Sequence, residues 1–294
     1  MDLNNNIQLI DFKTIIFKLI DNKMHEFIIY DKEYYVFDYK YNTFYLSNGF
    51  ENQFFNKNYI YNNLNTIILA LKLNKSIYKL SLINLSNIYI DYIIKAMINK
   101  LFLKELELSS VKIKNLDYLL NIINYNKITI LKLDHIFKNN INFLLPSLKI
   151  NETIHTLILT NNKINNIDEL LLILSSKTNL KILDLSFNLI DDIKSLKYLS
   201  TNTSITTLKL NNNKIKNINS LIELLQINKT LQIINLSYNY ISNIDPLIEI
   251  LKNNKTLKYF YMNNNKLKDI TQLLKMKNKK LKIFFDKKIF RALP

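Results

Sequence analysis

The chain has 294 residues, no cysteine, a single glycine and a formal net charge of +16. Without cysteine it can form neither disulfides nor thiolate metal sites, and one glycine cannot build a glycine-rich phosphate loop. No apolar run approaches the roughly 18 residues of a membrane span, so we expect no transmembrane segment. Residues 1–6 lack the basic-then-apolar layout of a signal peptide, so we expect an intracellular protein.

The amino-acid usage is skewed towards residues with AT-rich codons. Asn, Lys, Ile, Tyr and Phe are abundant, whereas Arg291 is the sole arginine. This usage indicates an AT-rich genome. The glycosylation sequons at Asn228 and Asn235 are then interpreted as by-products of an asparagine-rich composition.

Residues 1–62 do not repeat. Apolar spacing predicts a helix over residues 7–20, and the apolar runs at residues 27–30 and 34–37 predict a hairpin. A third strand is expected at residues 44–46. We predict a small α+β cap here, with a separate recognition module as the alternative.

From about residue 63 onwards, one pattern recurs. Its clearest copy runs from Leu180 to Ile190 and reads L-x-x-L-x-L-x-x-N-x-I. Full copies start at Ile154, Leu180, Ile205, Leu231 and Leu257. Weaker copies start at Ile77, Leu103 and Ile128, with Leu85, Val111 and Ile136 in the asparagine position, and a partial copy starts at Leu281. Such periodic self-similarity indicates a stacked repeat architecture.

The residue spacing within a copy predicts its secondary structure. The L-x-L core alternates as a strand with one buried face does. After the asparagine, apolar residues such as Ile241, Ile244 and Leu247 follow at helical spacing. Each repeat is therefore predicted to be a strand, a turn, a short helix and a second turn. No single repeat can bury its apolar face, so neighbours must stack.

The pattern resembles the leucine-rich repeat family over about residues 64–290, with repeats of about 25 or 26 residues. The resemblance implies an α/β solenoid with a curved parallel sheet on the concave face and short helices on the convex face. We place this array at residues 63–294, with residues 281–290 as the C-terminal capping strand. The resemblance also implies a structural asparagine ladder at Asn162, Asn188, Asn213, Asn239 and Asn265. Repeats without the asparagine should have a different turn.

Residues for catalysis are scarce. The histidines are His25, His135 and His155, and no spacing rule places a nucleophile beside any of them. A metal site at His135 and His155 is conceivable, but two exposed, variable positions are the simpler interpretation. We therefore expect no catalytic residue, no metal and no cofactor, and we predict that the protein is not an enzyme.

The third and fifth residues of each strand point out of the concave face. These positions are charged in the first repeats and apolar or aromatic in the last. Exposed aromatic clusters are typical of protein contact sites. The predicted partner-binding residues are Ile182, Phe187, Ile233, Tyr238, Tyr259, Tyr261 and Phe285. The alternative is that the C-terminal cap covers them.

The leading functional hypothesis is a monomeric, non-catalytic adaptor that binds a protein on the concave face. A first alternative is electrostatic binding of nucleic acid or anionic membrane through lysines at the turns. The scarcity of arginine argues against specific nucleic-acid recognition. A second alternative, implied by the breadth of the family, is a regulator of a partner enzyme such as a GTPase or phosphatase. The turn lysines include Lys112, Lys114, Lys163, Lys214, Lys216, Lys266 and Lys268.

Overall fold

The computed structural model forms two compact units, Met1–Ile136 and Phe137–Pro294, and each is described by itself. The residues that the structure describes are 7–8, 26–30, 36–38, 43–47, 65–66, 68–83, 90–137, 141–276, 278 and 280–285.

The first unit begins with strands that share one sheet with the first repeats. Strand β2 (Glu26–Tyr30) lies parallel to both β4 (Thr43–Ser47) and β5 (Lys79–Ile83). Strand β3 (Val36–Asp38) is antiparallel to β4 and to β1 (Ile7–Gln8). The predicted strand at residues 44–46 is therefore confirmed.

Two other predictions for this segment are not confirmed. The hairpin between residues 27–30 and 34–37 is wrong, because β2 has β4 and β5 as its neighbours. The apolar runs identified both strands but carried no information about their partners. Residues 7–8 form a strand, and the remainder of the helix predicted for residues 7–20 lies outside the described residues.

The repeats of the first unit contribute β5, β6 (Glu105–Ser109) and β7 (Ile130–Asp134), which pair in parallel and in register. Helices α3 (Ile90–Ala96) and α4 (Leu116–Tyr125) follow β5 and β6 in the chain. The inward leucines of these strands, such as Leu106 and Leu131, are fully buried. Strand alternation thus produces one buried face, as the sequence predicts.

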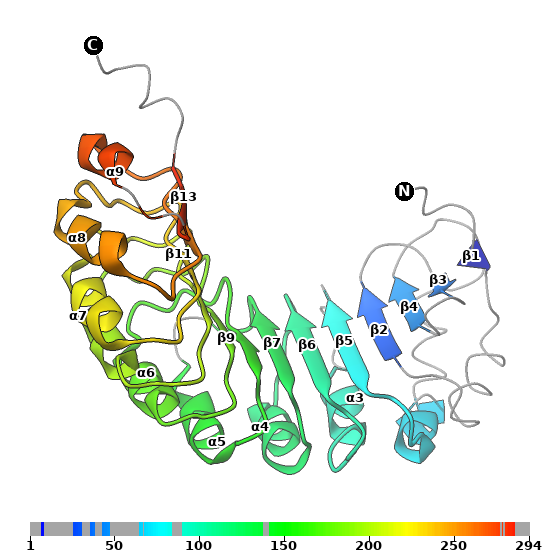
Figure 1. Cartoon of the computed structure of the whole chain (residues 1–294). Helices are drawn as coiled ribbons and strands as arrows, with labels where there is room; N and C mark the ends of the chain where they lie inside the picture. Colours follow the sequence, from blue (N-terminus) through cyan, green and yellow to red (C-terminus); the bar gives the residue numbers. More distant parts are fainter. Residues whose placement is uncertain are drawn as a thin grey trace. The chain divides into compact units, whose positions relative to one another are not determined.

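The second unit repeats the same order of elements. Figure 1 shows its strands forming one layer and its helices the other. Its parallel strands are β8 (Thr156–Ile158), β9 (Ile182–Asp184), β10 (Thr207–Lys209), β11 (Ile233–Asn235), β12 (Tyr259–Tyr261) and β13 (Lys282–Phe284). Its helices are η2 (Asn142–Leu144), α5 (Leu145–Ile150), α6 (Asp168–Ser175), η3 (Lys194–Leu199), α7 (Asn219–Ile227), α8 (Asp245–Asn253) and α9 (Thr271–Lys275).

The core of the second unit lies between these layers. The middle residue of each strand from β8 to β12 is fully buried, and so are helix residues such as Leu196, Leu224 and Leu251. Close packing of leucine and isoleucine from adjacent repeats supplies the main stabilisation, because no repeat has a core of its own. The predicted repeat of strand, turn, short helix and turn is confirmed.

One backbone feature marks the turn after the strands. The residue before each asparagine of the repeat pattern has a φ between 54° and 58° in the second unit. In the first unit, Ser110 and His135 have φ values of 50° and 52°, although Val111 and Ile136 replace the asparagine there. At these two positions the backbone therefore does not differ as expected, and the turn with Leu85 lies outside the described residues. The repeats with and without the asparagine differ instead in strand length, since β6 has five residues and β9 has three.

Among the described residues, no helix is both long enough and apolar enough to cross a membrane.

Candidate functional site

The asparagines of the repeat pattern connect adjacent turns in the second unit. Asn188 Oδ1 accepts hydrogen bonds from the backbone N–H groups of Asn162 (2.9 Å) and Ile164 (3.0 Å). Its Nδ2 donates to the carbonyl oxygens of Leu159 and Leu185. Asn213, Asn239 and Asn265 make matching bonds one repeat further along, and Asn162 Oδ1 accepts from the N–H of Phe137. A buried amide is tolerated because its donor and acceptor are both satisfied.

A second set of buried asparagines lies at the other turn, three residues before the strand pattern begins. Asn228 is 2% exposed; its Oδ1 accepts from the N–H groups of Thr230 and Leu231. Its Nδ2 donates to the carbonyls of Leu199 and Asn202, in the preceding repeat. Interpreting this sequon as a by-product of composition is therefore wrong, because Asn-x-Thr here encodes a hydrogen-bonded turn. The recurring N-x-[S/T]-[L/I] spacing was the signal that sequence analysis missed.

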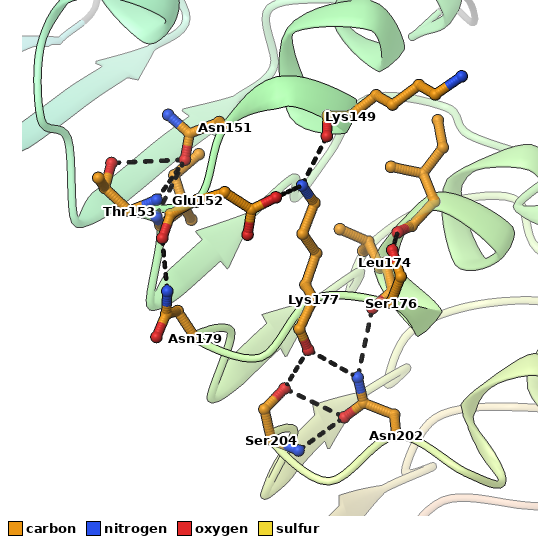
Figure 2. Close-up of polar contacts among 12 residues, drawn as sticks. Lys149, Asn151, Glu152, Thr153, Leu174, Ser176, Lys177, Asn179, Asn202 and Ser204 are labelled. Atoms are coloured by element: carbon orange, nitrogen blue, oxygen red, sulfur yellow. Dashed lines mark hydrogen bonds and ion pairs between the residues drawn. The ribbon is translucent and has the colours of Figure 1, made fainter.

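Lysine takes the place of this second asparagine in two repeats. In the second unit, Lys177 is 7% exposed, and its Nζ donates to the Lys149 carbonyl and the Glu152 carboxylate, both at 2.6 Å (Figure 2). Asn202 then donates to the carbonyl of Lys177 and continues the set. In the first unit, Lys100 donates to the carbonyls of Lys72 and Asn74.

Burial, together with the nearby charge of Lys75, lowers the pKa of Lys100. The long lysine side chain reaches the carbonyls that an asparagine amide would reach, so these lysines are structural.

The outward face of the first unit's sheet is charged and internally paired. Lys132 Nζ lies 2.7 Å from Glu105 and 3.7 Å from Glu107, and Lys79 lies 3.5 Å from Glu105. Burial lowers the pKa of Lys132, but its hydrogen bond to Glu105 and the charges of both glutamates outweigh this and raise it overall. Ser81 also donates to Glu107. These groups satisfy one another and leave little charge for a ligand.

The outward face of the second unit's sheet ends in an aromatic stack, defined as Tyr259, Tyr261 and Phe284. The rings of Tyr259 and Tyr261 lie 6.4 Å apart on the same strand. Tyr261 stacks on Phe284 of the neighbouring strand at 4.6 Å with an interplanar angle of 11°. These rings form a continuous half-exposed aromatic surface on β12 and β13.

The aromatic residue from β13 in this stack is Phe284 and not the predicted Phe285. Strand pairing aligns Tyr261 with Phe284, which shifts Phe285 into line with the inward Met262. The cause is a shorter connection. Leu281 donates to Asn278 as Leu257 donates to Asn254, but β13 begins at the next residue, so one residue is missing before the strand.

Ile182 and Ile233 lie in the same row of the sheet face as Tyr259. Strand pairing aligns Ile182 with Thr207, Thr207 with Ile233, and Ile233 with Tyr259. Both isoleucines are half-buried. The neighbouring row carries an ion pair between Lys209 and Asp184 at 3.2 Å.

Phe187 and Tyr238 lie beyond the strands, in the turn that follows each of them. Their side chains are 52% and 55% exposed, and their φ values are 58° and 57°. Each N–H donates to a carbonyl of the following repeat, at Asn211 and Asn263 respectively. The predicted partner-binding residues thus fall in two places, the sheet face and the turns that follow its strands.

Solved structures of internalins from Listeria monocytogenes have a similar fold. Internalin C2 is 25% identical, with 74% of this chain and 84% of that chain covered and a TM-score of 0.51. A second internalin, InlF, is 18% identical, with 92% of this chain and 88% of that chain covered and a TM-score of 0.53. The chain has the fold of a leucine-rich repeat solenoid. No protein-family model matches the chain, and no curated protein matches it.

The histidines of this solenoid have no catalytic setting among the described residues. His135 lies in the first unit and is exposed in the turn after β7. His155, in the second unit, contacts the Thr153 carbonyl through Nδ1 at 2.8 Å. His25 lies outside the described residues, within which no cluster of three His, Asp or Glu side chains could hold a metal ion.

Proposed function

We propose that this protein is a non-catalytic, monomeric, intracellular scaffold that binds a protein partner on the outward sheet face of its second unit. The aromatic stack of Tyr259, Tyr261 and Phe284 carries this proposal. Tyrosine and phenylalanine are costly to leave half-exposed, and they supply large contact areas when a partner excludes water. Ile182 and Ile233 extend the apolar row towards the middle of the unit.

The contrast with the first unit supports the choice of surface. There the outward face consists of carboxylates and lysines that pair with one another. Charged groups that already pair with one another gain little from a partner, whereas a buried aromatic anchor dominates many interfaces. We therefore assign the first unit's face no anchor role and place the partner on the second unit.

The turn lysines offer a second, electrostatic mode of binding to nucleic acid or anionic membrane. The two modes differ in their salt dependence. Phosphate binding through lysines weakens steeply as salt is raised, whereas contacts to the aromatic stack persist.

Affinity capture in cells that naturally express the chain tests this proposal. The variant Tyr259→Ala plus Tyr261→Ala is expected to lose its specific protein partners at least about tenfold, because hot-spot truncations often cost 2 kcal/mol or more. Tyr92→Ala plus Tyr198→Ala is the matched control, since these tyrosines are exposed and lie on convex-side helices. Retention of every partner by the first variant would refute the proposed binding face.

A further inference from the structure

The turns after the strands of the second unit alternate in chemistry from one repeat to the next. The residues before the ladder asparagines are Asn161, Phe187, Asn212, Tyr238 and Asn264. The residues after them are Lys163, Leu189, Lys214, Tyr240 and Lys266. Three repeats thus read Asn-Asn-Lys, and the two between them present apolar side chains on both sides of the asparagine. We call these positions the turn rows.

Parallel pairing holds the turn rows in register. Phe187 N–H donates to the Asn211 carbonyl, Asn212 N–H to Ser237, and Tyr238 N–H to Asn263, each at 2.8–2.9 Å. Adjacent strands lie about 4.8 Å apart, so Phe187 and Tyr238 are separated by about 10 Å, with Lys214 from the repeat between them. Apolar and basic groups therefore alternate along the surface about every 5 Å.

The two aromatic residues occupy a backbone conformation that favours asparagine. All five residues before the ladder have a positive φ, and three of them are asparagine, which tolerates that region. A bulky side chain at φ near 57° is a conformational outlier, and such strain persists mainly at functional sites. Since both rings are more than half exposed, core packing does not compensate for the strain.

The turn rows are basic and contain no carboxylate. No residue of either turn row is aspartate or glutamate. Among the described residues, no carboxylate pairs with Lys163 or Lys214, and Lys266 Nζ lies 4.6 Å from the centre of the Tyr240 ring. Leu189 is 37% and Tyr240 42% exposed beside these lysines. The surface therefore combines apolar anchors with positive charge that no carboxylate of the described residues neutralises.

We infer that the turn rows bind an acidic amphipathic helix of a partner protein. Two residues seven positions apart lie on the same face of an α-helix, about 10 Å apart, which matches the two apolar repeats. Glutamates three or four positions from each anchor then face the lysines between and beside them. This inference rests on the proposed function and names the class of partner segment that the protein recognises.

Single-stranded nucleic acid is the competing occupant, because aromatic rings and lysines also bind stacked bases and phosphates. Two observations favour the acidic helix. Leu189 offers no planar ring for a base. Arginine, the residue best suited to bidentate phosphate contacts, is absent from these rows.

The test is a fluorescence anisotropy titration of the full chain with two synthetic peptides. Both are built from alanine and glutamate with the same composition and contain two leucines. In the first, the leucines are seven residues apart, with glutamates three and four residues from each. In the second, they are five residues apart, about 140° around the helix, so they do not share a face. A labelled oligothymidylate is the nucleic-acid probe.

The decisive variant is Phe187→Asn plus Tyr238→Asn, which gives these repeats the asparagine of their neighbours. We expect it to bind the first peptide at least about 30-fold more weakly than the natural chain, in line with the loss of a hot spot. Its melting temperature should nevertheless rise by about 2–4 °C, because backbone strain is removed. Tyr198→Asn, on a different surface, should leave peptide binding unchanged.

The inference is overturned if the first peptide fails to bind the natural chain, binds no better than the second, or binds the variant equally well. It is also overturned if oligothymidylate binds more tightly than the peptide and is lost in the same variant. In any of these cases, loss of partners by the Tyr259→Ala plus Tyr261→Ala variant would still support the proposed function. The two ideas therefore fail separately.

Discussion

Replacing Asn213 with leucine is expected to lower the free energy of unfolding by about 2–4 kcal/mol, the range for a lost buried hydrogen bond plus an orphaned donor. The side chain is buried, and its Oδ1 accepts from the N–H of Ile190 at 3.0 Å. A backbone N–H has one proton to donate, so this group would be left buried and unpaired.

The carbonyl groups to which Asn213 donates are less affected by this substitution. The carbonyl of Leu185 accepts from both Asn188 and Asn213, and that of Leu210 from both Asn213 and Asn239. Each would retain one donor after the substitution. The expected loss thus comes mainly from the unpaired N–H of Ile190. Asn213→Leu should therefore lower the free energy of unfolding less than the replacement of two adjacent ladder asparagines would.

Urea unfolding followed by circular dichroism measures this loss, with Asn165→Leu as the control. Asn165 is exposed, and the structure gives its side chain no hydrogen bond. Its substitution should change the free energy of unfolding by less than about 0.5 kcal/mol. Equal stability of the two variants would mean that the hydrogen bonds of Asn213 contribute nothing to the fold.

Replacing Lys177 with methionine is expected to lower the free energy of unfolding by about 1–3 kcal/mol, because the partly buried hydrogen bond from its charged Nζ to the Lys149 carbonyl is lost. Methionine keeps most of the length and apolar surface of the lysine stem. The ion pair with Glu152 adds little to this figure, since that carboxylate is largely exposed to solvent.

The variant Lys177→Asn separates hydrogen bonding from charge. Asparagine occupies the equivalent position at Asn202, Asn228 and Asn254, where its amide donates to carbonyls of the preceding repeat. We therefore expect Lys177→Asn to remain within about 1 kcal/mol of the natural chain in the same urea assay. If it were as unstable as Lys177→Met, the charge of the lysine and not its hydrogen bonds would be the stabilising feature.

The repeat architecture was predictable because strand alternation and helical spacing recur with every copy. Partner choice in the first unit was not, since the apolar runs at β2 and β3 look alike and nothing local specifies that β2 pairs with β4 and β5. The predicted register of β13 was wrong for another reason. A single residue missing after Leu281 moves every later side chain to the opposite face.

The candidate surface was also predicted in part. Alternation alone identified Tyr259 and Tyr261 as outward residues, and they lie on the outward face of β12. The positive φ of Phe187 and Tyr238 could not be read from those residues, because aromatic side chains do not signal that conformation. Comparison with Asn161, Asn212 and Asn264 at the same repeat position would have revealed it.

The central claim, that a protein binds the aromatic stack, is tested most directly by site-specific photocrosslinking. A benzophenone amino acid is placed at position 261 in one variant and at position 198 in another, and both are irradiated in cells that express the chain naturally. We expect a discrete protein adduct from position 261 and none from position 198. Adducts at position 198 alone, or nucleic acid in place of protein at position 261, would contradict the claim.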